Sequence, residues 1–276
     1  MGLHFFVTGF FLKSIAADNI GGRIDPFWQG QGPDGLSAIE HWLVALLYYC
    51  QIYGDFAGYS LMALGMARLL GYRLPANFRV PMIAASLQEF WRRWHITLSR
   101  WLREYLYIPL GGSRTSQART SINILVTMLL GGLWHGAGLT FLIWGAMHGA
   151  GLVSERLLGL SRVRAFQGHW LAWYAVTQVW VTVAWVFFRS PDLRFSLHYL
   201  AQMVNLAGAG AWLVRSEILF ALVFALPVVV HHGAALLLPR LPRRFLGGAL
   251  GLATAIMLLV CLVVTAPSKT FLYFKF

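Results

Sequence analysis

Residues 120–155 read TSINILVTMLLGGLWHGAGLTFLIWGAMHGAGLVSE. Two apolar runs, 120–136 and 138–155, meet here around the glycine-rich sequence GGLWHGAG at 131–138. A membrane-spanning helix needs about 20 predominantly apolar residues, and both runs come close to that length. The stretch therefore predicts a hairpin of two membrane helices with a histidine, His135, at its turn.

Apolar runs of similar length recur elsewhere in the chain, at 36–54, 170–188, 214–238 and 245–266. Of the 276 residues, 58% are hydrophobic and 12% are charged, whereas an ordinary soluble domain has roughly 25% charged residues. The composition thus excludes a soluble fold and predicts an all-α, polytopic membrane protein. Lys13 interrupts a shorter apolar run from Leu3 to Ala17, which we interpret as a truncated or re-entrant helix.

The basic residues lie mainly in the loops between these runs. The formal net charge is +12, and arginines cluster at 73–119, 156–164 and 240–244. Cytoplasmic loops of membrane proteins carry an excess of arginine and lysine, so these loops are expected in the cytoplasm and nucleic acid is not expected as a partner. Because the chain has no repeat and no long linker, residues 1–276 are predicted to form a single membrane domain.

Residues 73–119 are too polar to span a membrane and unusually aromatic for a loop. Apolar and aromatic side chains recur at helical spacing over 90–105, with arginines on the opposite side. This pattern is typical of a helix that lies in the membrane interface or re-enters the membrane. Ser86 and Glu89 form a candidate capping box at its start, and the sequence PLGG at 109–112 ends it.

His135 is the strongest candidate for a chemical role. An ionisable group at membrane depth is costly and is a functional hypothesis by default. The glycines around it permit an irregular turn, and non-helical backbone at that depth is tolerated only where it is buried in protein or lines a wet cavity. Spacing alone leaves two interpretations open: an imidazole that faces a cavity, or a packed turn residue hydrogen-bonded to a carbonyl.

Other histidines also lie in apolar surroundings. His95 is on the apolar face of the predicted interfacial helix, where it is either an aromatic-belt residue or a catalytic partner that faces the same cavity. His148 lies in the sequence GAMHG, whose glycines four apart predict a helix contact and an interhelical hydrogen bond. His231 and His232 point about 100° apart on a helix, which disfavours a bis-histidine haem or metal site.

Acyl transfer is the chemistry that suits His135. A hydroxyl is a poor nucleophile at neutral pH, and a neutral imidazole accepts its proton as attack begins. Nearby arginine or tryptophan N–H groups would stabilise the developing oxyanion. The chain has no G-x-S-x-G elbow, which disfavours a serine hydrolase, and its two cysteines, Cys50 and Cys261, lie in apolar runs and predict no metal site.

Four ordered motifs resemble the membrane-bound O-acyltransferase family. They are DFAGYS at 55–60, EFWRRWHITLS at 89–99, YLYIPLGG at 105–112 and GLWHG at 132–136. The branch that they resemble is the bacterial alginate O-acetyltransferase subfamily, to which the D-alanyl transferase of teichoic acid modification is related. Members of this branch are longer, so the chain is expected to lack several of their N-terminal helices.

The resemblance implies a ring of helices around a tunnel through the membrane. It also implies that His135 is the catalytic base and that His95 is a second functional histidine. By their places in the motifs, the candidate substrate-binding residues are Arg93, Trp94, Trp134, Asp55 and Tyr59.

The implied enzyme takes an acyl group from a cytosolic donor, acetyl-CoA or another acyl thioester, and passes it across the bacterial plasma (inner) membrane. The acceptor would be a cell-surface or exported polysaccharide. The expected partners are membrane lipid and an extracytoplasmic acyl-transfer protein that completes the reaction, and no bound cofactor is expected. The alternative is a truncated, non-catalytic membrane relative that serves as an assembly partner or a conduit.

Overall fold

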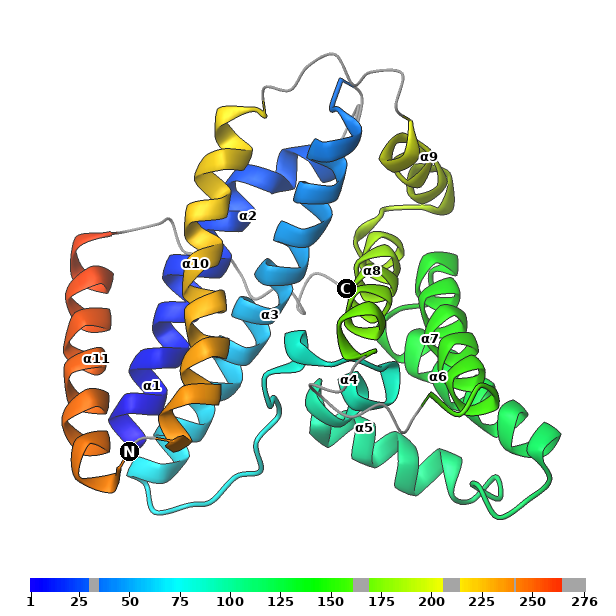
Figure 1. The fold of residues 1–276 in the computed structure, drawn as a ribbon, viewed down its shortest axis with the longest axis horizontal. Helices are drawn as coiled ribbons and strands as arrows, with labels where there is room; N and C mark the ends of the chain where they lie inside the picture. The colour runs from blue at the N-terminus through cyan, green and yellow to red at the C-terminus, as the bar shows by residue number, and fades with distance from the viewer. Residues whose placement is uncertain (30–34, 161–168, 206–213, 241, 265–276) are drawn as a thin grey trace. The chain divides into compact units, whose positions relative to one another are not determined.

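The computed structural model describes residues 1–29, 35–160, 169–205, 214–240 and 242–264. Their regular structure is entirely helical, which confirms the all-α prediction for the described part of the chain. The chain forms two compact units. The first comprises the described residues within 1–76 and 205–276, and the second comprises those within 77–204. Figure 1 shows the helices of each unit.

The first unit is built on a close pairing of α1 and α3. Its helices are α1 (Gly2–Phe11), α2 (Asp18–Ile24), α3 (Ala38–Leu69), α10 (Ser216–Leu237) and α11 (Arg243–Val263), with a π-helical segment at Leu12–Ala17 and 3-10 turns at Asp25–Trp28 and Leu238–Arg240. A β-carbon at Gly9 would overlap the carbonyl oxygen of Gly58, and one at Gly65 would overlap the backbone nitrogen of Phe6. The small residues therefore let the two backbones approach closely, as is typical of membrane helix pairs.

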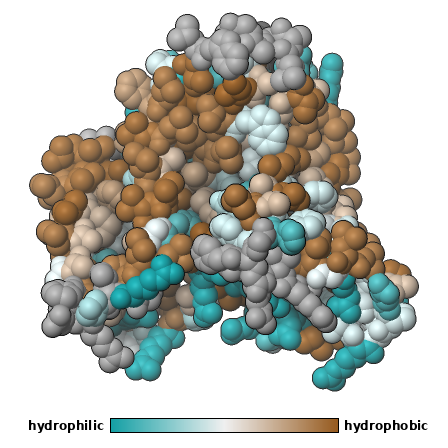
Figure 2. Space-filling view, viewed as in Figure 1, coloured by the Kyte–Doolittle hydropathy of each residue, from teal (hydrophilic) through white to brown (hydrophobic). Residues whose placement is uncertain are grey.

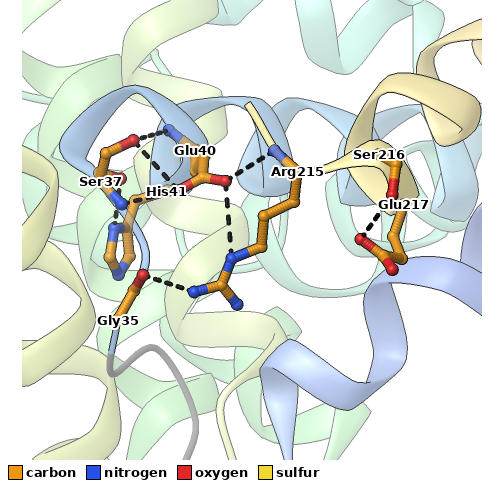
Figure 3. Close-up of polar contacts among 7 residues, drawn as sticks. All are labelled: Gly35, Ser37, Glu40, His41, Arg215, Ser216 and Glu217. Carbon is orange, nitrogen blue, oxygen red and sulfur yellow. Dashed lines mark hydrogen bonds and ion pairs between the residues drawn. The ribbon is translucent and has the colours of Figure 1, made fainter. Parts of the chain in front are cut away.

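A polar cluster joins the start of α3 to the start of α10 (Figure 3). Ser37 and Glu40 form a capping box, in which the Ser37 hydroxyl accepts from the Glu40 backbone N–H and the Glu40 carboxylate accepts from the Ser37 backbone N–H at 2.8 Å. The same buried carboxylate accepts from the backbone N–H of Arg215 at 3.0 Å. Glu40 thus satisfies orphan donors at two helix starts at once.

The second unit carries the predicted functional motifs. Its helices are α4 (Leu87–Arg93), α5 (Ile96–Leu102), α6 (Gln117–His135), α7 (Leu139–Leu157), α8 (Trp170–Arg189) and α9 (Leu193–Val204), with a 3-10 turn at Pro81–Ile83 and a π-helical segment at Arg103–Tyr107. The predicted hairpin is present as α6 and α7. A β-carbon at Gly132 would overlap the carbonyl oxygen of Phe141, and one at Gly145 would overlap that of Met128.

The prediction of one continuous helix over 90–105 is wrong. α4 ends at Arg93, α5 begins at Ile96, and His95 between them has a left-handed backbone with φ 43°. The released backbone groups find partners in the segment before α4, because Ile96 N–H donates to the Asn77 carbonyl at 2.9 Å and Arg79 N–H donates to the Arg93 carbonyl at 2.9 Å. These long-range bonds outweigh the helical periodicity of the sequence.

The capping box predicted at Ser86 is half correct. The Ser86 hydroxyl accepts from the Glu89 backbone N–H at 3.0 Å, as expected for an N-cap. The Glu89 carboxylate, however, accepts from the backbone N–H of Ala85 rather than that of Ser86. A second carboxylate, that of Glu155 on α7, accepts from the N–H groups of Leu87 and Gln88 and completes the helix start.

Among the described residues, three helices are long and apolar enough to cross a membrane: α8, the whole of α10, and residues Leu246–Val263 of α11. The helices α3, α6 and α7 lie where spans were predicted but are not among these three, because polar side chains interrupt them. Large apolar side chains are exposed on α10 and α11, and Figure 2 shows hydrophobic surface over both. Such a surface is stable only against lipid or another apolar partner, so the protein is a membrane protein.

Candidate functional site

His135 is the last residue of α6, and the close packing of α6 on α7 sets its position. After it, Gly136 is fully extended and Gly138 caps α7. The imidazole is buried and meets the edges or faces of neighbouring rings. Ring-centroid distances are 5.2 Å to Trp144 of α7, 5.0 Å to Phe188 of α8 and 4.9 Å to Trp134.

His95 lies at the break between α4 and α5. Because its backbone is left-handed, its side chain does not follow the periodicity of either helix. Its Nδ1 is 3.3 Å from the side-chain oxygen of Asn77, which also accepts from the backbone N–H and the hydroxyl of Thr97. Because an amide oxygen accepts only, His95 Nδ1 carries the proton, and Nε2 has the basic lone pair. Burial lowers the pKa of His95 to about 4, so its imidazole is neutral at physiological pH.

The structure brings the two predicted histidines together. The imidazole of His95 is 6.1 Å from the indole of Trp134, centroid to centroid, and the same indole contacts His135. Two histidines and one tryptophan from two separate motifs therefore form one cluster; their catalytic roles stay a prediction.

Arg93 and Trp94 occupy different surroundings, although they adjoin His95. Trp94 is buried against Phe78, Phe90 and Trp185 at centroid distances of 5.1, 5.6 and 5.1 Å, and so packs in the core beneath His95. Arg93 forms an ion pair with Glu89, one turn earlier on α4, at 2.6 Å. Both side chains thus support the backbone at the break, and substrate binding by either stays a prediction.

Asp55 and Tyr59 belong to α3 in the first unit. The carboxylate of Asp55 pairs with the ammonium of Lys13 at 2.6 Å, and Lys13 also pairs with Asp18 at 2.7 Å. Lys13 lies in the π-helical segment, a local distortion that occurs frequently at functional sites. Tyr59, one turn after Asp55, is 46% exposed. The substrate-binding role predicted for these two residues is not tested by their geometry.

An arginine-lined cavity of about 610 Å³ opens on the second unit. Its basic lining residues are Arg79, Arg92, Arg100, Arg103 and Arg156. The wall also includes Ile96, the residue after His95, and Met128 of α6. The sequence predicted that arginines would set the membrane topology and that some would lie near the reacting groups, but it did not predict that these five would line one cavity. Their high density over 92–103 was the available signal for an anion site.

The prediction for His148 is wrong. Its side chain is fully buried, yet neither ring nitrogen has a hydrogen-bond partner within the part of the chain that the structure describes. The glycines on either side pack against α6 as predicted, but the imidazole points among aromatic rings instead of at a polar group. His232 differs, because its Nδ1 donates to the carbonyl of Val228 at 2.9 Å.

Comparison with known proteins identifies the family. Residues 22–191 match the membrane-bound O-acyltransferase family, abbreviated MBOAT. The chain belongs to this family. Both histidines of the Trp134 cluster and all lining residues of the arginine cavity lie inside the matched range.

Several curated relatives support this assignment of the MBOAT chain. It is 44% identical over 207 residues to the probable alginate O-acetylase AlgI of Pseudomonas aeruginosa, covering 75% of this chain and 38% of the relative. It is 43% identical over 211 residues to the peptidoglycan O-acetyltransferase of Helicobacter pylori, covering 75% and 39%. A teichoic acid D-alanyltransferase of Bacillus subtilis is 31% identical over 148 residues, covering 49% and 35%. The chain thus spans about two fifths of these relatives or less.

Proposed function

We propose that this chain carries the reaction centre of a membrane-bound O-acyltransferase that acetylates hydroxyl groups of a cell-surface or exported polysaccharide. The observation that carries the proposal is the shared contact of His95 and His135 with Trp134. The relatives named as alginate O-acetylase and peptidoglycan O-acetyltransferase support a polysaccharide acceptor.

In the proposed reaction, His135 is the general base. It accepts the proton of the acceptor hydroxyl, which belongs either to the polysaccharide or to the partner protein that passes the acyl group on, as that oxygen bonds to the carbonyl carbon of the thioester. Collapse of the tetrahedral intermediate breaks the carbon–sulfur bond, and the leaving thiolate takes the proton from His135. The products are an O-acyl ester and a free thiol. His95, whose acceptor nitrogen is Nε2, orients the acceptor molecule through a second donor group, because the single hydrogen of the attacking hydroxyl goes to His135.

The arginine cavity supports a donor that carries phosphate groups, such as acetyl-CoA. Guanidinium groups bind phosphate oxygens through paired, charge-assisted hydrogen bonds, and five of them surround one opening here. The arginine-rich loops are expected in the cytoplasm, so the donor would bind from that side. We place the protein in the bacterial plasma (inner) membrane as a multi-pass protein, with an extracytoplasmic partner protein that completes transfer to the polysaccharide.

Complementation tests the proposal. Cells that lack the gene would receive the wild-type chain, His135→Ala, or His198→Ala, a control at an exposed histidine of α9 in the same unit. The readout is O-acetyl ester released from surface polysaccharide by mild base, normalised to the amount of protein in the membrane fraction. We expect restoration by wild type and His198→Ala alone. Equal restoration by His135→Ala would remove His135 from the mechanism, and failure of the wild type would refute activity of the chain by itself.

A further inference from the structure

His148 occupies a position that packing alone does not explain. The imidazole is 0% exposed and stacks on Phe90, with ring centroids 6.1 Å apart and an interplanar angle of 7°. Two indoles make T-shaped contacts with the imidazole, with ring centroids 5.1 Å away for Trp91 and 4.8 Å away for Trp144. A neutral imidazole always has one N–H donor and one acceptor nitrogen, and burial of both without partners costs free energy. A phenylalanine would fill the same space without that cost.

The two neighbouring indoles share this property. The Nε1 groups of Trp91 and Trp144 are buried and, like both nitrogens of His148, have no hydrogen-bond partner among the described residues. Trp91 and Trp144 also contact each other, with ring centroids 5.7 Å apart. The three rings therefore form one set with buried nitrogen atoms, which we call the Trp91–Trp144–His148 triad. Buried polar groups in native proteins nearly always pair with protein or with ordered water.

The triad provides the hydrogen-bonding groups that a water molecule needs. Each indole offers one donor, and a neutral imidazole offers one donor and one acceptor. A buried water makes about three hydrogen bonds, commonly to groups that would otherwise be unsatisfied. Two indole donors can pair with its oxygen, while one of its own O–H groups pairs with the acceptor nitrogen of His148.

The triad also connects two parts of the candidate site. Trp144 meets the imidazole of His135 edge-on at 5.2 Å, and Trp91 lines the arginine cavity. All of these residues belong to the second unit. The orientation of the Trp144 indole thus sets one wall around His135, and the same indole contacts both other rings of the triad.

We propose that His148 is a positioning residue of the acyl-transfer site, which binds an ordered water together with Trp91 and Trp144 and so holds the Trp144 indole against His135. This inference rests on the proposed acyltransferase function. His148 does not touch the reacting atoms. It acts through Trp144, whose hydrogen-bonded orientation keeps the imidazole of His135 in the geometry for proton transfer.

The test compares His148→Phe with His148→Gln in the full chain. Phenylalanine keeps the ring and the stack on Phe90 but removes both polar atoms, whereas glutamine keeps a donor and an acceptor. We expect the kcat of His148→Phe to fall by about tenfold or more, the size of effect that a small misplacement causes, in a protein that still folds. The KM for the acyl donor should stay within about twofold, because no binding group is lost. His148→Gln should recover a large part of kcat.

Trp144→Phe is a second variant that tests the same inference, and it can be measured even if His148→Phe does not fold. It removes the indole N–H and keeps an aromatic ring beside His135. We expect a comparable fall in kcat, and a double variant with His148→Phe that is no slower than the slower single variant, because both remove the same water site. Wild-type kcat in either single variant would overturn the inference while leaving the proposed function intact. An inactive wild-type protein would instead refute the proposed function.

Discussion

The imidazoles of His95 and His135 both contact the indole of Trp134, with ring centroids 6.1 and 4.9 Å from it. One histidine comes from the break between α4 and α5, and the other from the last turn of α6. Each histidine is positioned by different interactions: Asn77 and the left-handed backbone for His95, and the glycine-mediated contact of α6 with α7 for His135. The cluster can therefore be disturbed from either side.

The two histidines should act as one unit in catalysis. We expect His135→Ala to lower the rate of acyl transfer by about 10²–10⁴-fold, the usual contribution of a general base, and His95→Ala to cause a severe loss. The double variant should be no slower than His135→Ala alone, because residues of one catalytic unit are not additive. The measurement is initial-rate transfer from labelled donor in membrane vesicles. Additive losses in the double variant would show that the two histidines act independently.

Close contact between α6 and α7 should be required for activity. Gly132→Ala would place a β-carbon against the carbonyl oxygen of Phe141, so α6 must shift and carry His135 with it. We expect a lower melting temperature and a loss of acyl transfer. Gly247→Ala is the matched control, because a β-carbon there meets nothing within 4 Å. If Gly132→Ala had wild-type stability and activity, close approach of the two helices would be unnecessary.

The environment of His95 should determine the acid limit of activity. Burial holds the pKa of His95 near 4, so its imidazole protonates and loses its acceptor nitrogen only when the pH falls through that value. Asn77→Asp would add a negative charge beside Nδ1, which favours the protonated imidazole and raises its pKa. We expect the acid limb of the pH–rate profile to move to higher pH in this variant. An unchanged acid limb would show that protonation of His95 does not limit turnover.

The arginine cavity should govern donor affinity rather than the chemical step. We expect Arg100→Glu to raise the KM for the acyl donor by about tenfold or more, because hydrogen bonds to charged groups contribute about 1.5–3 kcal/mol each. Arg114→Glu makes the same charge change at an exposed arginine of the second unit that does not line the cavity. Equal effects in the two variants would point to general electrostatic attraction and not to a donor site.

Periodicity and composition were sufficient to predict where helices form, but not where a helix is interrupted. The runs around 120–155 predicted the α6–α7 hairpin because each helix forms from its own local sequence. The break at His95 was not predictable in this way, since it depends on hydrogen bonds from Ile96 and Arg79 to residues elsewhere in the segment. The same limit applies to His148, whose flanking glycines indicated a helix contact but not an imidazole among aromatic rings.

The amino-acid sequence by itself determined the helical, membrane-embedded class of this protein and its four family motifs, because hydropathy and motif order are properties of contiguous residues. Only the tertiary structure decided that His95 and His135 share Trp134, that five arginines line one cavity, and that the ring nitrogens of Trp91, Trp144 and His148 are buried. Each of these arrangements joins residues from different helices. Side-chain packing and long-range hydrogen bonds set such contacts, and no spacing along the chain encodes them directly.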